Sequence, residues 1–279
     1  MLVVVAVSVL SLPLSNWVSG RARDSGYGAE VGSHVHAVTS AGVRTTVIGH
    51  AANATSPGPG DWASRRPSVG HLYAAVGTTR GLLVASESGI SVSRDDGRSF
   101  SSVWTAPSIG AVRALGIDDL DGGTVFAATA AGEMFVSNDQ GASFEKRSVS
   151  TTRLEGVIAV SPTVSSDALA VDAARGLVRT RDGGRSWVDA PVVDETGTDV
   201  GPQVVAVAQD PDNDLRIVVA SESEVYQSND GGTRWAALDG PPQIAALTFS
   251  ASSEVLLASA ANGRSVTYRQ RGDGWVVVV

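Results

Sequence analysis

The stretch Thr180-Arg-Asp-Gly-Gly-Arg-Ser-Trp187 decides how this chain folds. It places a hydroxyl residue, an aspartate, a glycine and an aromatic residue at the first, third, fifth and eighth positions of an octet. The same octet occurs at Ser93–Phe100, Ser137–Phe144 and Ser228–Trp235. A degenerate copy lies near the C-terminal end. Its first, third, fifth and eighth positions are Tyr268, Gln270, Gly272 and Trp275.

The octets recur at a nearly regular interval. Starting from Asp95, the third positions are 44, 43, 48 and 40 residues apart, at Asp139, Asp182, Asp230 and Gln270. A repeat of about 40 to 50 residues is long enough for one four-stranded blade of a β-propeller. The spacing therefore predicts an all-β propeller of four-stranded antiparallel blades.

Each interval has the same order of apolar segments and turns. In the fourth interval, Val204–Ala208, Leu215–Ala220 and Val225–Ser228 are separated by turns, and Trp235 begins a further segment. Short continuous apolar runs are typical of strands covered on both faces, as stacked blades require. Five blades are clear from this pattern.

A degenerate sixth blade is expected across residues 31–66. His34–Val38 and Thr45–Ile48 have the composition of strands. Trp62, followed by Pro67, fits the order of aromatic and proline seen after other octets. We therefore predict a six-bladed propeller over residues 31–279, preceded by a linker at 21–30.

Residues 1–20 differ from the rest of the chain. Leu2–Leu14 is apolar and is followed by the small residues Ser19 and Gly20, which resembles a secretory signal. No Lys or Arg precedes the apolar run, so an uncleaved membrane anchor and a buried first strand are alternatives. Export predicts a secreted or cell-envelope protein, in which only this segment meets a membrane.

Composition narrows the functional classes. The net charge is −8 and no basic face is visible, which is not typical of a nucleic-acid binder. There is no cysteine, so disulfides and thiolate metal sites cannot contribute. Residues 58–63 match the glycine pattern of a dinucleotide-binding fingerprint in sequence, but no helix is expected after them, so the match does not indicate a dinucleotide site. We expect a monomer without a cofactor.

The residue types of the octet predict a turn between the third and fourth strands of a blade. An aspartate there can accept hydrogen bonds from N–H groups two and three residues later. The glycine permits a positive φ, and the hydroxyl residue can bond the carboxylate. The aromatic residue then packs between blades. We expect a structural role for Ser93, Asp95, Gly97, Phe100, Ser137, Asp139, Gly141, Phe144, Thr180, Asp182, Gly184, Trp187, Ser228, Asp230, Gly232, Trp235, Gly272 and Trp275.

These octets resemble the Asp-box, or bacterial neuraminidase repeat, of sialidases, sortilin-type receptors, some xyloglucan hydrolases and photosystem-II assembly factors. The resemblance covers residues 31–279 and implies a propeller whose boxes lie on the outer rim, away from the ligand face. It leaves the activity open. The sialidase Arg-Ile-Pro signature is absent, with only Arg65-Arg-Pro67 as a faint echo. Tyr226 and Tyr268 lie on expected third strands beside octets and are interpreted as packing residues, whereas Tyr73 lies in an expected first strand and Tyr27 precedes the domain.

The face opposite the octets is where a ligand is expected, and it would display acidic residues. Glu87, Asp172 and Glu222 come from turns of different blades and are candidate catalytic carboxylates for glycoside hydrolysis. The turns that carry them are too short to wall a pocket, which favours a solvated acidic rim. His34 and His36 lie two residues apart on an expected strand and are weak candidates for a metal site.

The preferred function is that of an exported, non-catalytic propeller that binds or scaffolds a glycan or protein partner. The alternative is a sialidase-like glycoside hydrolase that uses carboxylates on the face opposite the octets. A third possibility is that the chain belongs to a larger propeller.

Overall fold

The structure is a computed structural model. It describes residues 4–6, 35–41, 44–49, 53–56, 63–65, 72–78, 81–95, 98–105, 111–118, 123–149, 153–221, 224–238, 240, 244–249, 255–261, 264–271 and 274–277.

The strands after the first follow the chain in units of four, and each unit is an up-and-down antiparallel sheet. The first units consist of β2 (Val35–Ala41), β3 (Arg44–Gly49), β4 (Asn53–Ser56) and β5 (Ala63–Arg65), then β6 (Leu72–Thr78), β7 (Gly81–Ser86), β8 (Gly89–Ser93) and β9 (Ser101–Trp104). The next consist of β10 (Val112–Asp118), β11 (Thr124–Thr129), β12 (Glu133–Ser137) and β13 (Glu145–Val149), then β14 (Leu154–Val160), β15 (Ala168–Asp172), β16 (Gly176–Thr180) and β17 (Val188–Asp189). The last consist of β18 (Ala206–Asp210), β19 (Asn213–Ala220), β20 (Val225–Ser228) and β21 (Ala236–Leu238), then β22 (Ile244–Phe249), β23 (Val255–Ala261), β24 (Arg264–Arg271) and β25 (Gly274–Val277).

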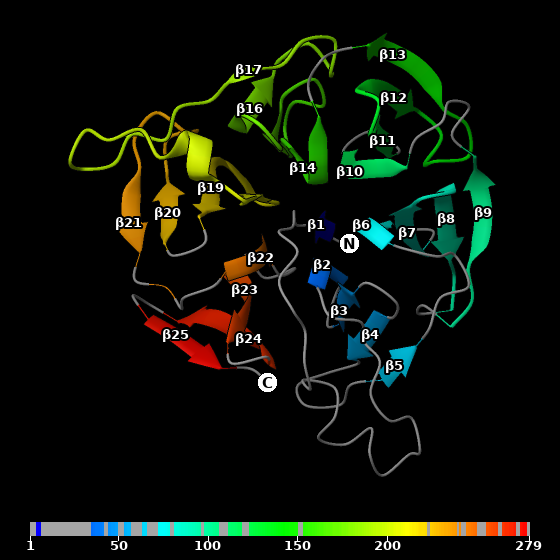
Figure 1. Ribbon diagram of the computed structural model, residues 1–279, viewed down its shortest axis with the longest axis horizontal. Coiled ribbons are helices and arrows are strands. Elements are labelled where there is room, and N and C mark those ends of the chain that lie inside the picture. Colours follow the sequence, from blue (N-terminus) through cyan, green and yellow to red (C-terminus); the bar gives the residue numbers. More distant parts are fainter. Residues whose placement is uncertain are drawn as a thin grey trace.

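The units are arranged radially in a ring, with the first strand of each near the centre and the fourth outside (Figure 1). β2 contacts β22, so the first unit packs directly against the last. No sheet of the described residues mixes strands from the two ends of the chain. The fold is a β-propeller, as predicted.

Two units are joined at the centre of the ring. β10 and β14 pair in parallel, with Ala114 opposite Gly156 and Gly116 opposite Ile158, so that β10–β17 form one eight-stranded sheet. A Cβ added to Gly116 would lie 2.4 Å from the carbonyl oxygen of Ile158, which shows why a glycine is needed there. Because this pairing merges two units, the number of blades stays a prediction.

The aromatic residues of the octets pack between neighbouring units, as expected. Trp187 lies in one core cluster with Phe126 and Met134 of the preceding unit. The Phe144 ring lies 4.8 Å from that of Trp104, which belongs to the preceding β9. Truncating a packed ring of this kind costs about 3–5 kcal/mol. Each of these aromatic side chains therefore holds two neighbouring sheets together.

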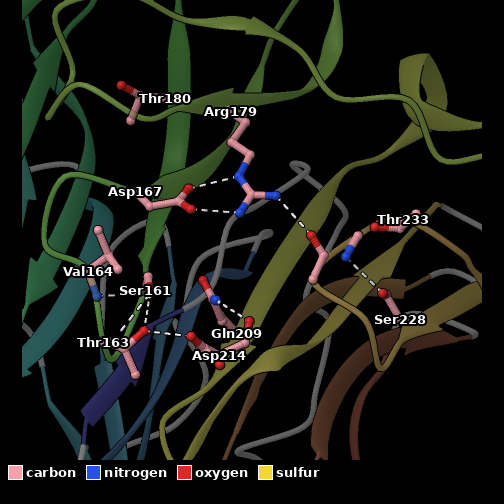
Figure 2. A network of polar contacts seen from close by, with 12 residues as sticks. Ser161, Thr163, Val164, Asp167, Arg179, Thr180, Gln209, Asp214, Ser228 and Thr233 are labelled. Carbon is pink, nitrogen blue, oxygen red and sulfur yellow. Dashed lines mark hydrogen bonds and ion pairs between the residues drawn. The ribbon is translucent and has the colours of Figure 1, made fainter.

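Polar contacts reinforce the junction between the β14–β17 and β18–β21 units (Figure 2). The guanidinium of Arg179 donates from Nε and Nη2 to both carboxylate oxygens of Asp167, at 2.8 and 2.6 Å. Its Nη1 donates at 2.9 Å to the carbonyl oxygen of Gly231, in an octet of the next unit. A second link runs from the Thr163 hydroxyl to Asp214 at 2.6 Å. Arg179 thus fixes a neighbouring turn as well as its own hairpin.

Replacing Arg179 is expected to weaken the whole domain. Arg179→Met leaves the Asp167 carboxylate and the Gly231 carbonyl without this donor, and should lower the free energy of unfolding by about 2–3 kcal/mol. Arg179→Lys should recover only part, because an ammonium cannot supply the planar fork. Urea unfolding followed by tryptophan fluorescence measures both. The control is Arg181→Met at an exposed octet arginine, and equal losses in the two Met variants would contradict the assignment.

The structure describes one strand within residues 1–20. β1 (Val4–Ala6) pairs antiparallel with β2, with Val4 opposite Ala41, and lies near the centre of the ring (Figure 1). The rest of residues 1–20, and the linker at 21–30, lie outside the described residues. An export segment here remains a prediction. Across the part of the chain that the structure describes, no helix has the length and apolar character needed to cross a bilayer.

The antiparallel order of each unit separates two ends of the ring. The octets form the turns between third and fourth strands, at the end where first strands finish. The turns between second and third strands lie at the opposite end, where first strands begin. A short 3₁₀ helix, η1 (Gly201–Gln203), lies in the link that leads into β18 and was not predicted.

Candidate functional site

The hydroxyl and carboxylate of each described octet are bonded to one another, as expected. Ser137 donates to Asp139 at 2.7 Å, and Thr180 donates to Asp182 at 2.8 Å. The contacts at Ser93 and Ser228 are both 2.9 Å. The first and third positions of the octet therefore form one hydrogen-bonded pair in four separate units.

The amide partners of the carboxylate differ from the expectation by one residue. We expected N–H groups two and three residues later, but Asp182 accepts from Arg185 and Ser186, three and four residues later, both at 2.9 Å. Asp230 accepts from Thr233 and Arg234 in the same way. The turn is one residue wider than predicted because glycines at its tip adopt positive φ, 69° at Gly183 and 81° at Gly184.

Two further contacts were not anticipated. A serine at the seventh position donates its hydroxyl to the second carboxylate oxygen, at 2.6 Å from Ser186 to Asp182. The N–H of the glycine at the fifth position donates to the first hydroxyl, at 3.0 Å from Gly184 to Thr180. The octet glycines Gly97 and Gly272 lie outside the described residues. Both carboxylate oxygens are therefore bonded within the turn at Asp95, Asp139 and Asp182, whereas the bonds of Asp230, which has Arg234 at the seventh position, go to Oδ1.

These contacts lower the pKa of the octet aspartates. Burial alone would raise the pKa of Asp182, but the hydroxyl and N–H of Ser186 and the Thr180 hydroxyl bring it down to about 2. For Asp95 the Ser99 hydroxyl is the largest cause, and its pKa also falls to about 2. A folded-state pKa below the unfolded value of about 3.9 stabilises the fold above that pH. The stabilisation is lost as the pH falls through the folded pKa.

The octets should therefore make stability acid-sensitive between about pH 4 and pH 2. Asp182→Asn is expected to be less stable than the parent at pH 7, and the difference should shrink as the pH falls toward 2, because the parent carboxylate then takes up its proton. Urea midpoints at pH 7, 4 and 2.5 measure this. Glu145→Gln, at an exposed glutamate of β13, is the control. A difference that stays constant with pH would show that the charge of Asp182 is not what matters.

Asp172 is held at the other end of the ring in the same manner. Its buried carboxylate accepts from the N–H of Arg153 at 2.7 Å, and from the N–H groups of Ala174 and Arg175, both at 2.9 Å. These donors come from its own turn and from the strand beside it. The geometry therefore places this catalytic candidate in a structural turn.

Glu87 lies in a polar cluster made by three successive units. Its carboxylate accepts from the hydroxyl of Tyr73 on β6 at 3.4 Å. The Arg113 guanidinium on β10 lies 4.1 Å from the centroid of the Tyr73 ring. Glu155 on β14 is near enough to act on the tyrosine electrostatically. These residues lie at or beside the start of first strands, at the end of the ring opposite the octets.

Tyr73, for which the sequence predicted only a place in a first strand, has a polar partner in the structure. Burial raises its pKa above the ordinary value, Arg113 opposes the rise, and Glu87 adds to it. The hydroxyl therefore keeps its proton and donates it to Glu87. The sequence signal was the place of Tyr73 at the second residue of a first strand, the position that Arg113 and Glu155 hold in the next two units.

A second tyrosine–carboxylate pair lies in the β18–β21 unit. The Tyr226 hydroxyl donates to Glu224 at 2.5 Å, and the ring is buried as expected. Burial is the largest cause that raises the pKa of Tyr226, and the hydrogen bond and negative charge of Glu224 add to it, so that the pKa is about 12. Asp194 also contributes to this rise, but its carboxylate is engaged by Thr196 and Thr198 within its own turn. This pair rigidifies the turn before β20.

Several predicted residues cannot be placed. Glu222 and His34 lie outside the described residues, and so does the His36 side chain, whose backbone belongs to β2. Among the described residues, no group of three or more His, Cys, Asp or Glu side chains is arranged to hold a metal ion. Of the three candidate carboxylates, the structure describes Glu87 and Asp172 and shows no contact between them.

No protein-family model matches the sequence, and a comparison with curated proteins gives no match. Solved structures do resemble it. The crystal structure of the GH74 xyloglucanase from Xanthomonas campestris has a TM-score of 0.56 at 16% identity, over 74% of this chain and 37% of that one. YCF48 from Cyanidioschyzon merolae has a TM-score of 0.52 at 16% identity, over 81% and 77% of the two chains.

The Neurospora crassa Pan2 WD40 domain has a TM-score of 0.56 at 9% identity, over 81% of this chain and 85% of that one. This chain spans about a third of the length of the GH74 proteins that it matches. At such identities the similarity establishes the fold alone. Whether the octets make this chain a member of the Asp-box group remains a prediction.

Proposed function

We propose that this chain is an exported, non-catalytic Asp-box propeller that binds a glycan or protein partner at the end of the ring opposite the octets. The observation that supports it most is the state of the carboxylates. The carboxylates of Asp95, Asp139, Asp182 and Asp172 receive hydrogen bonds on both oxygens, and that of Asp230 receives three on Oδ1. A general acid or nucleophile needs an oxygen available to the substrate, and the first four have none.

The shape of the binding end agrees with binding rather than catalysis. Its turns between second and third strands are 87–88, 130–132, 173–175 and 221–224, between two and four residues each. Turns of this length cannot build deep walls, and a hydrolase needs a site that excludes water. A shallow surface over the ring is suited to an extended partner.

A glycoside hydrolase is the second candidate, and one contact favours it. The Tyr73 hydroxyl bonded to Glu87, with Arg113 over the ring, has the composition of a tyrosine nucleophile beside its base. The described residues show one arginine there, whereas the sialidase resemblance would require three. The propeller fold does not decide between the two, because one similar structure is a xyloglucanase and another is a WD40 domain.

A panel of fluorogenic glycosides, sialosides included, separates these functions. The purified protein should release no product above the level of its Glu87→Gln, Asp172→Asn and Glu222→Gln variants. It should bind a member of a glycan array or an extracytoplasmic protein. Product release that one of these three variants abolishes, while Glu145→Gln keeps it, would establish a hydrolase. No ligand in either binding assay would also count against the proposal.

Export is testable separately. Residues 1–30 fused to alkaline phosphatase, which is active only outside the reducing cytoplasm, should give enzyme activity in a bacterial host. The same fusion with Leu10→Arg should lose it, because a charge interrupts the apolar run. Activity that is equally low in both fusions would refute export, and would favour β1 as an ordinary strand of the fold.

A further inference from the structure

The same four-residue pattern opens five of the described first strands and begins two residues before the sixth, β18: an apolar residue, a variable residue, a small residue and an apolar residue. The pattern is Val35-His-Ala-Val38, Leu72-Tyr-Ala-Ala75, Val112-Arg-Ala-Leu115, Leu154-Glu-Gly-Val157, Val204-Val-Ala-Val207 and Ile244-Ala-Ala-Leu247. Only the second position changes chemical class, through His36, Tyr73, Arg113, Glu155, Val205 and Ala245. The first, third and fourth positions of the repeat are kept apolar or small for packing. The second position is not, so its side chain can contact a ligand.

The backbone singles out the same position. On β6, Leu72 pairs with Ser86 and Ala74 with Ala85, so Tyr73 is an extra residue opposite one step of β7. Arg113 is extra in the same way between Val112 and Ala114. The registers of β2 and β22 shift at His36 and Ala245. A bulge re-aims the side chain it carries and is frequent beside binding sites, so this geometry recurs at the binding end.

Arg113 has donor capacity that the described residues do not use. Its guanidinium stacks on Tyr73, but it makes no hydrogen bond or ion pair with any described residue, and its buried Nε atom has no acceptor among them. Glu155 is its neighbour on β14, one residue before the pairing of Ala114 with Gly156. A guanidinium donates only and a carboxylate accepts only, so the two residues bring complementary groups to the starts of neighbouring strands.

The charges of this group decide the class of ligand. Arg113 contributes one positive charge, whereas Glu87 and Glu155 contribute two negative charges, so the sum is −1. A carboxylate or phosphate ligand would gain no net attraction from these three residues. A neutral sugar is suited to them, because every hydroxyl both donates and accepts, and can meet the guanidinium and the carboxylates at once.

We propose that the second residues of the first strands form a ligand-specificity ring, and that Tyr73, Arg113 and Glu155 bind a neutral carbohydrate there. This rests on the proposed binding function and names its ligand class. Glu87 positions the Tyr73 hydroxyl, and the short turns beside the ring leave room for a chain of sugars to enter and leave.

The test measures binding of immobilised neutral cello-, xylo-, manno- and malto-oligosaccharides, with sialylated and uronic-acid oligosaccharides and a peptide library as competing classes. At least one neutral oligosaccharide should bind saturably. Arg113→Gln and Glu155→Gln should each raise its Kd tenfold or more, and Tyr73→Phe should raise it severalfold. Arg98→Gln and Glu145→Gln are matched controls on an exposed octet turn and on an outer strand, and should leave Kd within twofold.

Unchanged melting temperatures would show that the Tyr73, Arg113 and Glu155 variants fold. Arg113→Lys keeps the positive charge but removes the planar guanidinium, and so tests whether its paired donors are needed. Neutral binding that survives Arg113→Gln and Glu155→Gln overturns the inference. Binding of anionic sugars or peptides alone overturns the inference and leaves the proposed binding function standing. Hydrolysis of a bound neutral sugar would overturn the non-catalytic function and leave the ring assignment intact.

Discussion

An ionised carboxylate enclosed by its own turn is the interaction on which the rest of this structure depends. In the described octets, the aspartate receives a hydroxyl from two residues earlier and N–H groups from up to four residues later. Charge-assisted bonds of this kind are stronger than neutral ones. They fix where the third strand ends and where the aromatic residue enters the next strand. A turn that could open would let Trp187 leave the junction with the preceding unit, and the ring would lose contact between its sheets.

The same turns also serve as acceptors for neighbouring units. The Ser148 hydroxyl on β13 donates to the carbonyl oxygen of Gly184 at 2.8 Å, and Arg179 on β16 donates to that of Gly231. Each link runs from one unit to an octet of the next. The octet therefore closes its own hairpin with the aspartate and offers a backbone oxygen across the junction. Between the described residues of the first and last units, the ring is closed by packing of β1 and β2 against β22, and this arrangement helps it hold its sheets in order.

The sequence predicted the fold well because the octet is local. Its spacing, its hydroxyl–carboxylate pair and its ring at the junction all follow from residues within eight positions of one another. Contacts between units were harder to foresee. The parallel pairing of β10 with β14 places Gly116 against Ile158 and Ala114 against Gly156, residues 42 apart in the sequence, and no pattern within one repeat signals it. Asp172 looked like a free acid because its three N–H donors include Arg153, which lies on another strand. Tyr73 was overlooked because a tyrosine in an apolar strand is ordinarily a core residue.

The division of labour between the two ends of the ring follows from these interactions. At the octet end, the carboxylates are occupied by hydrogen bonds, so substitution there acts on stability. At the other end, the first strands β2, β6, β10 and β22 start with a bulge, and the four-residue pattern keeps the flanking positions small and apolar for packing. The second position of the pattern bears no packing duty common to all units, because it holds Arg113, Glu155 and Val205 alike. Under the proposed binding function, such a fold would change its ligand through these side chains while the hydrogen bonds of the octets, which hold the ring together, stay in place. The proposal therefore places recognition at the start of the first strands and stability in the repeated motif.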